Sequence, residues 1–264
     1  MTTIVRTATL ADYTYFARLF PELGTGDSVA TEARWRDEIV QDVLVLEDEG
    51  DVVGYTFAQQ LAETGYIRHL VVDPRDRRKG YGRRLLSELR ARLRAAGRTS
   101  WCLNVDPGNP AAVALYESVG MRFAYHSSAL HLLWSRAKRS TDTEVVVQAF
   151  GAEEDATLER TFSLPLGQVA DHRAKPERIF LKATKHGELQ AIAVFDRLFP
   201  GLYPLRSRSI DAAWKLLEAV HINAKRGDDH IRLLVEDDDA LRDALVDAGA
   251  ESVLTVDHYR SLLD

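Results

Sequence analysis

A basic loop with two glycines, residues 77–86 (RRKGYGRRLL), follows an apolar strand and opens an amphipathic helix. The strand, 66–72, is almost continuously apolar and ends at Asp73-Pro74. Downstream, leucines recur at helical spacing while arginines fill the other positions, so one face of this helix packs on a core. The chain must therefore contain a sheet with this turn at its edge. The leucines are Leu85, Leu86, Leu89 and Leu93, and Gly97 ends the helix.

The backbone of this turn predicts an anion site. Amide groups at the start of a helix lack partners within the helix and lie at its positive end, where a phosphate or pyrophosphate can bind. Gly80 and Gly82 would let such a ligand approach the backbone closely. Two common phosphate motifs are excluded. The P-loop needs a wider glycine spacing followed by Lys-Ser/Thr, and the dinucleotide fingerprint needs a third glycine where Leu85 stands.

Two separate segments resemble the GNAT superfamily of N-acyltransferases. The first, VVDPRDRRKGYGRRLL, is similar to the family's acyl-CoA loop, Arg/Gln-x-x-Gly-x-Gly/Ala after a strand that ends in Val-x-Pro. The second, NPAAVALYESVGMRF, is similar to the family's Asn-x-x-Ala-x-x-Leu-Tyr-x-x-x-Gly-Phe segment, with Met121 in place of the aromatic residue. The resemblance covers roughly residues 3–135. The matching residues are Arg77, Gly80, Gly82, Asn109, Ala112, Leu115, Tyr116 and Gly120.

This resemblance implies a site for acetyl-CoA and no metal. The amides of the loop would hold the CoA pyrophosphate, and the edge of the preceding strand would pair with the pantetheine arm. Asn109 would lie near the pantetheine and cap its helix. Tyr116 would protonate the departing thiolate as general acid, with an ordinary core aromatic as the alternative. The loop residues are Arg77, Arg78, Lys79, Gly80, Tyr81, Gly82 and Arg83, and the strand residues are Leu70, Val71 and Val72.

The group that deprotonates the acceptor amine is left open. In family members with a side-chain base, it often comes from the strand before the loop, where this chain presents Tyr66 and Arg68. Arginine stays charged and tyrosine titrates near 10, so neither suits the task. Glu63 is the nearest carboxylate, a water relay is the alternative, and Arg68 can instead pair with a substrate carboxylate. We expect His69 and His131 to be structural.

Alternating strands and helices predict an α/β (α+β) fold, and with the resemblance a GNAT-like mixed, mostly antiparallel sheet flanked by helices. The order of elements starts again after the polar segment 136–143 (RAKRSTDT), so we expect two tandem copies, a catalytic domain over 1–137 and a second over 144–264. Glycines that end equivalent helices are 23 residues apart in the first half and 22 apart in the second. They are Gly97 and Gly120, then Gly227 and Gly249.

Apolar periodicity and helix caps give the expected elements. The expected strands cover residues 4–8, 43–47, 52–60, 66–72, 101–105, 121–125, 129–134, 145–149, 179–183, 189–195 and 231–236. The expected helices cover residues 10–20, 29–40, 109–120, 211–224 and 239–248, together with the helix that Gly97 ends.

The second half is predicted to lack the CoA loop. A shift of 130 residues aligns the glycine loop with residues 207–212 (SRSIDA) and Tyr116 with Val246, so neither the glycines nor the acid is retained. The first half carries a net charge of +2 and the second −8. A degenerate accessory domain is therefore expected, which would close the acceptor groove, attract a cationic amine or form an interface.

Composition and the absence of targeting patterns indicate where the protein is expected to act. With 45% hydrophobic and 28% charged residues, the chain resembles a soluble globular protein. Its start does not resemble a signal peptide and no apolar stretch has membrane length, so we expect a cytoplasmic protein without a membrane partner. The local basic excess does not extend into a stripe, so nucleic acid is not an expected partner. Cys102, the single cysteine, is expected to be a small buried residue.

The predicted function is N-acetyl transfer from acetyl-CoA to a primary amine of a small molecule or peptide, by direct attack in a ternary complex. A monomer or homodimer is expected. The alternative is a non-catalytic CoA-binding regulatory or interaction protein.

Overall fold

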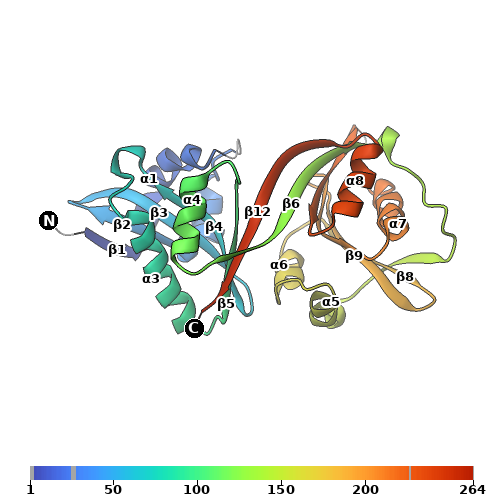
Figure 1. Cartoon of the computed structure of the whole chain (residues 1–264), viewed down its shortest axis with the longest axis horizontal. Coiled ribbons are helices and arrows are strands. Elements are labelled where there is room, and N and C mark those ends of the chain that lie inside the picture. The colour runs from blue at the N-terminus through green and yellow to red at the C-terminus, as the bar shows by residue number, and fades with distance from the viewer. Residues whose placement is uncertain (1–2, 25–27, 226, 264) are drawn as a thin grey trace. The chain divides into compact units, whose positions relative to one another are not determined.

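The chain forms two compact units, each a mixed sheet with helices on its faces (Figure 1). Unit 1 comprises Met1–Ala124 and His258–Asp264, and unit 2 comprises Tyr125–Asp257. The computed structural model describes residues 3–24, 28–225 and 227–263. Within these residues, no helix is long and apolar enough to cross a membrane.

The sheet of unit 1 has the strand order β1-β2-β3-β4-β5, followed by the end of β12. Strands β1 to β4 are antiparallel neighbours, whereas β4 and β5 run parallel. The bounds are β1 Thr3–Thr7, β2 Val43–Asp48, β3 Asp51–Gln60, β4 Thr64–Val72, β5 Ser100–Val105 and β12 Glu251–Leu262.

Helices pack on both faces of this sheet. Alternate residues of β2 belong to two different cores, Leu44 and Leu46 to one and Val43 and Val45 to the other. The first core contains the four leucines predicted on α3 together with residues of α4, and the second is rich in aromatic residues of α1 and η3. The helical segments are η1 Leu10–Asp12, α1 Tyr13–Leu19, η2 Phe20–Leu23, α2 Glu32–Arg34, the π-helix η3 Trp35–Ile39, η4 Val40–Asp42, η5 Pro74–Asp76, α3 Tyr81–Ala95 and α4 Pro110–Ser118.

The sheet of unit 2 has the order β6-β11-β10-β9-β8-β7, with β10 and β11 parallel and the other neighbours antiparallel. The strands are β6 Arg122–Leu133, β7 Val145–Ala149, β8 Arg178–Lys185, β9 Glu188–Asp196, β10 Gly201–Ser207 and β11 His230–Glu236. The helical segments are η6 Trp134–Arg136, η7 Ala152–Glu154, α5 Asp155–Thr161, α6 Gln168–Arg173, α7 Ile210–His221 and α8 Asp239–Asp247.

The two units repeat one topology. Read from β7, unit 2 has the order β7-β8-β9-β10-β11-β6, which matches β1-β2-β3-β4-β5-β12 in unit 1, including the parallel pair at the fourth and fifth strands. This confirms the predicted tandem fold. The sixth strand of each unit is not the one that its place in the sequence would suggest. Unit 1 is completed by residues that follow unit 2 in the chain, and unit 2 uses β6, which begins at the end of unit 1.

Several elements differ from the sequence predictions. The strands expected over 121–125 and 129–134 form the single strand β6, and the helix expected over 29–40 begins only at Glu32, after its N-cap Thr31. Strands β10 and β12 and helix α6 were not expected at all. Strand β10 pairs with β9 through a shifted register, α6 is short, and the first residues of β12 are all exposed, so none of them gives a clear periodic pattern.

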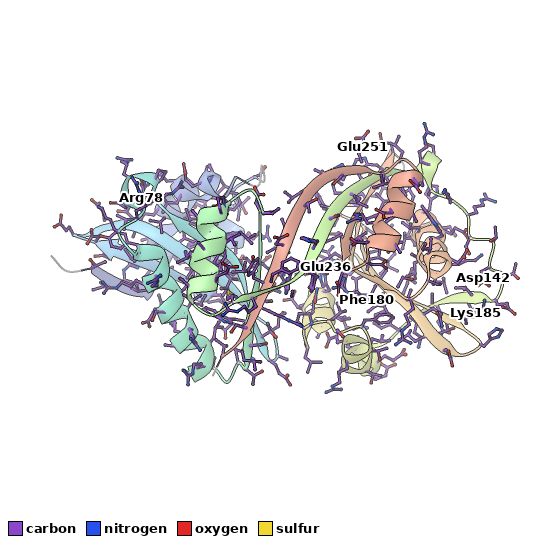
Figure 2. All side chains as sticks on the ribbon, in the orientation of Figure 1. Arg78, Asp142, Phe180, Lys185, Glu236 and Glu251 are labelled. Atoms are coloured by element: carbon purple, nitrogen blue, oxygen red, sulfur yellow. The ribbon has the colours of Figure 1, made fainter. Side chains whose placement is uncertain are left out.

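The boundary between the units follows Ala124 and differs from the expected linker 136–143. That segment is held on unit 2, where Lys185 Nζ lies 2.7 Å from Asp142 Oδ2 (Figure 2). The segment is polar because it makes hydrogen bonds and ion pairs within unit 2.

Candidate active site

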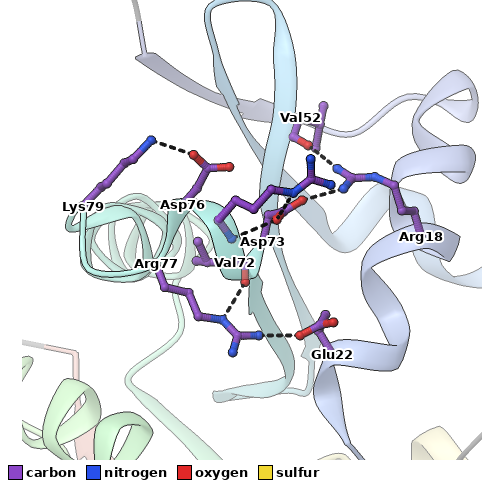
Figure 3. Close-up of polar contacts among 9 residues, drawn as sticks. Arg18, Glu22, Val52, Val72, Asp73, Asp76, Arg77 and Lys79 are labelled. Carbon is purple, nitrogen blue, oxygen red and sulfur yellow. Dashed lines mark hydrogen bonds and ion pairs between the residues drawn. The ribbon is translucent and has the colours of Figure 1, made fainter.

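The turn between β4 and α3 begins at a buried carboxylate, Asp73 (Figure 3). Arg18 Nη1 donates to Asp73 Oδ2 at 2.5 Å, and the N–H of Arg75 donates to Oδ1 at 3.1 Å. The Arg18 hydrogen bond, followed by the Arg75 amide, holds the pKa of Asp73 below its ordinary value. A charged Asp73 therefore anchors the turn to α1.

Two of the basic side chains brace this turn from within. Arg77 Nε donates to the carbonyl oxygen of Val72 at 3.1 Å, and its Nη2 donates to Glu22 Oε2 at 2.7 Å (Figure 3). Lys79 Nζ lies 2.7 Å from Asp76 Oδ1. Because these two cations already have carboxylate partners, the backbone amides are among the donors that the turn offers to a ligand.

Positive backbone angles shape the turn as it enters α3. Arg78 has φ 66° and Gly80 has φ 84°. A left-handed residue followed by a helical one directs successive N–H groups to one side, which makes a concavity suited to an anion. The first α-helical bond joins the N–H of Arg84 to the carbonyl of Gly80 at 3.1 Å, so the amides of residues 81–83 precede it. This geometry suits an anion such as a pyrophosphate, and the CoA contacts expected at this turn stay a prediction.

Glycine is favoured at positions 80 and 82 for different structural reasons. A Cβ at Gly80 would meet nothing within 4 Å, so glycine is favoured there by the left-handed conformation. A Cβ at Gly82 would lie 2.9 Å from Leu115 Cδ2 on α4, so glycine there allows α3 and α4 to pack closely. The sequence prediction assigned both glycines to close ligand approach, and the contact with Leu115 gives Gly82 a packing role as well.

Strand β4 has an open edge beside this turn. The register pairs residues 64–67 of β4 with residues 100–103 of β5, and among the described residues this pairing goes no further. On its other side, β4 remains paired with β3 as far as Val72. The main chain of residues 68–72 can therefore accept an extended ligand along the side where β5 diverges. The predicted pantetheine contacts lie on this edge and are Leu70, Val71 and Val72.

Helix α4 carries the predicted acid. Asn109 caps this helix, since its Oδ1 accepts from the N–H of Ala112 at 3.0 Å. Tyr116 is 8% exposed in the core shared by α3, α4 and the sheet, and burial raises its pKa to about 12. The phenol therefore stays protonated at neutral pH, as a proton donor must.

The two residues predicted to face the substrate lie together. Arg68 is the extra residue of a β-bulge, because Phe57 pairs with His69 while Ala58 pairs with Ile67. Its guanidinium carbon lies 3.7 Å from the centroid of the buried Tyr66 ring. Arg68 Nε and Nη2 both donate to the Oε1 atom of the same glutamine, Gln59, at 2.9 and 2.6 Å.

Glu63 lies just before the strand that carries Tyr66 and Arg68. It is exposed and directly precedes β4, where its carbonyl oxygen accepts from the N–H groups of Thr99 and Ser100. The turn follows the opposite end of β4, and a strand of 9 residues spans about 30 Å. Glu63 therefore lies at the start of β4, as expected, and its role as base remains a prediction.

A polar pair that sequence reasoning missed lies beside Tyr66. His258, from the part of β12 in unit 1, is 5% exposed, and its Nδ1 lies 2.8 Å from Asn104 Oδ1 on β5. The ring centroids of His258 and Tyr66 are 6.2 Å apart in an edge-to-face arrangement. The exposed residues at the start of β12 give no alternating pattern, so the sequence offers little signal for this strand. In the described residues, no cluster of His, Cys, Asp and Glu could hold a metal ion.

The equivalent position in unit 2 is built differently. Helix α7 opens on Ser209, whose Oγ accepts from the N–H of Ala212 at 3.1 Å, whereas α3 opens on glycine. A pocket of about 440 Å³ lies beside this turn, and its lining includes the ion pair between Arg206 Nη2 and Glu236 Oε2 at 2.6 Å. The Ser209 side chain thus accepts a hydrogen bond from an N–H group that a pyrophosphate would need, which is in keeping with the predicted loss of the CoA loop.

Comparison with known proteins finds a family that part of the chain resembles. The family model described as "Acetyltransferase (GNAT) family" matches residues 12–121. The [ribosomal protein bS18]-alanine N-acetyltransferase of Escherichia coli (strain K12) is 34% identical over 79 residues, which is 30% of this chain and 53% of that protein. The chain thus spans about half the length of the curated relatives it matches.

Solved structures agree over nearly the whole chain. A GCN5-related N-acetyltransferase from Sphaerobacter thermophilus superposes with a TM-score of 0.66 at 15% identity, covering 99% of this chain and 96% of its own. A tandem GNAT protein from the clavulanic acid biosynthesis pathway superposes with a TM-score of 0.57 at 16% identity, covering 100% and 99%. At these identities the likeness concerns the fold. Residues 12–121 of this chain therefore match the GNAT acetyltransferase family, and the whole chain has the fold of a tandem GNAT protein.

Proposed function

We propose that this chain transfers the acetyl group of acetyl-CoA to a primary amine of a small molecule or peptide, by direct attack in a ternary complex. The observation that carries this proposal is the pairing of two features at one end of β4. The amides at the start of α3 suit a pyrophosphate, and the edge of β4 beyond its pairing with β5, at residues 68–72, suits the pantetheine arm.

The reaction needs a group that protonates the departing CoA sulfur. It needs no covalent enzyme intermediate. Strand N–H groups polarise the thioester carbonyl, and Tyr116 protonates the leaving thiolate. Cys102 is the single thiol of the chain, and it is 3% exposed in a small cluster with Leu61 and Tyr66. Such burial disfavours an acyl-cysteine, since reactive cysteines are partly exposed.

The acceptor class is suggested by the relatives. They are named for the alanine of ribosomal protein bS18, which supports a peptide amino terminus as one acceptor. The identity extends over 79 residues only, so small-molecule amines are an equal part of the proposal. We further propose that unit 2 is an accessory domain without a CoA site of its own.

Thiol release from acetyl-CoA across a panel of amines tests the proposal. The panel includes peptides with an N-terminal alanine, amino acid amides and aliphatic diamines. We expect release with one class, intersecting initial-velocity lines, and the same pattern in the control Cys102→Ala. Parallel lines that disappear in this control would overturn direct attack. Binding of CoA without release for every amine would favour the alternative, a non-catalytic CoA-binding regulatory protein.

A further inference from the structure

The pair formed by His258 and Asn104 lies where β4 and β5 separate. The last residue of β5 paired with β4 is Leu103, and Asn104 is the next residue along the strand. His258 therefore sits, through its 2.8 Å contact with Asn104, at the point where the open edge of β4 begins.

The pair lies on the face of the sheet opposite to α3 and α4. Trp101, Leu103 and Val105 of β5 belong to the core beneath these helices, whereas Cys102 packs with Tyr66 on the other face. Successive side chains of a strand alternate between faces, so Asn104 lies on the same side as Cys102. Tyr116 belongs to the core under the helices, on the opposite face of the sheet. A thioester where β4 and β5 separate would have a phenol on one side and an imidazole on the other.

The contact with Asn104 selects one form of the imidazole. An amide oxygen only accepts hydrogen bonds, so the facing Nδ1 carries the proton. The lone pair of the neutral ring is then on Nε2, where it can accept a proton. The same arrangement, in which an amide side chain orients a histidine, serves acid–base chemistry in unrelated enzymes.

We propose that His258 is the general base for the acceptor amine and that Asn104 is its positioning residue. This inference rests on the proposed acetyl transfer. The amine nitrogen bonds to the acetyl carbonyl carbon as the carbon–sulfur bond breaks. The ammonium loses two protons in all. Nε2 of His258 takes one and passes it to solvent, and the other restores the proton that Tyr116 gives to sulfur.

The surroundings of His258 bear on its titration. The charged or titratable groups near it include Tyr66, with Arg68 above its ring, on β4, and Cys102 on β5. Asp257 and Arg260 are close to it in sequence on β12. A base of this kind makes kcat/KM rise with pH as the imidazole loses its proton.

The test compares His258→Gln with the full chain, using acetyl-CoA and the amine that gives the fastest thiol release. We expect kcat to fall by about 10²–10⁴-fold, the usual contribution of positioned proton transfer, and the rise of kcat/KM with pH to disappear. The affinity for CoA should be unchanged. His126→Gln is the matched control, because His126 Nδ1 also bonds a side-chain oxygen, Asp257 Oδ1, at 2.7 Å.

A second variant keeps the test decisive if His258→Gln fails to fold. Asn104→Asp places a carboxylate on the Nδ1 proton, which stabilises the imidazolium and should move the rise in kcat/KM to higher pH. Turnover by His258→Gln within threefold of the unmodified chain, or an unshifted profile in Asn104→Asp, would overturn this inference alone. Absence of thiol release by the unmodified chain with every amine would overturn the proposed function and this inference together.

Discussion

Replacing Gly82 by alanine separates packing from ligand approach as the reason for a glycine in the first turn of α3. The new Cβ would lie 2.9 Å from Leu115 Cδ2, which forces Leu115 to move against the core of unit 1. Overpacking of this kind costs about 1–3 kcal/mol, and because a flexible side-chain end is involved we take about 2. Alanine gains up to about 1 kcal/mol over glycine in helix propensity. The expected net loss in unfolding free energy is therefore about 1 kcal/mol.

The sign should reverse when Leu115 is shortened. In a Leu115→Ala background the contact no longer exists, so Gly82→Ala should stabilise the protein by up to about 1 kcal/mol. The coupling between the two positions is then about 2 kcal/mol, measured by urea unfolding of the four proteins in a double-mutant cycle. Gly80→Ala is the control, because its cost of about 1–2 kcal/mol comes from the left-handed backbone and should be the same in both backgrounds.

Calorimetric titration of the same proteins with CoA completes this test. We expect Gly82→Ala to bind CoA with nearly normal affinity when Leu115 is shortened. A coupling below about 0.5 kcal/mol, together with equal loss of CoA affinity in both backgrounds, would show that Gly82 serves the ligand and would refute the packing argument.

Three further results are expected. Tyr116→Phe should slow the single-turnover rate by about 10²–10⁴-fold while CoA affinity persists, and an unchanged rate would make Tyr116 a packing residue. The hydrogen bond from Arg6 lowers the pKa of Asp12 from 3.8 to about 2, so the stability that this pair contributes is present above pH 4 and lost as pH falls toward 2. In Asp12→Asn, the unfolding free energy should therefore depend less on pH between 4 and 2. An unchanged pH dependence would count against this pair. Calorimetry should give one CoA per chain, and two sites would contradict an accessory unit 2.

Features encoded within a few turns of chain were predictable from the sequence. The leucine spacing of α3 and the Asn-Pro start of α4 identify both helices, because amphipathic periodicity and a capping side chain act locally. The glycine loop also indicates its chemistry, since amides at a helix start bind anions whatever the rest of the fold.

Features that depend on distant pairing were not predictable. Residues 251–255 of β12 are all exposed, so burial gives this strand no apolar pattern at its start. Asn104 and His258 are 154 residues apart in sequence, and neither has a motif around it. The packing reason for Gly82 likewise requires α4 to be placed against α3, which only the tertiary structure provides.

The exchange of strand β12 makes the folding of unit 1 depend on residues that are synthesised after the whole of unit 2. Tyr259 and Leu263 are buried in the core of unit 1, and the N–H of Leu263 donates to the carbonyl of Thr99 at 2.8 Å. At about 5–20 residues per second, a ribosome needs on the order of 10–30 s to make the chain between Ala124 and His258. During this interval β5 is an unpaired sheet edge that any suitable strand can join. Neighbouring nascent chains can therefore donate β12 to one another, and domain-swapped dimers should form when this protein is made at high concentration.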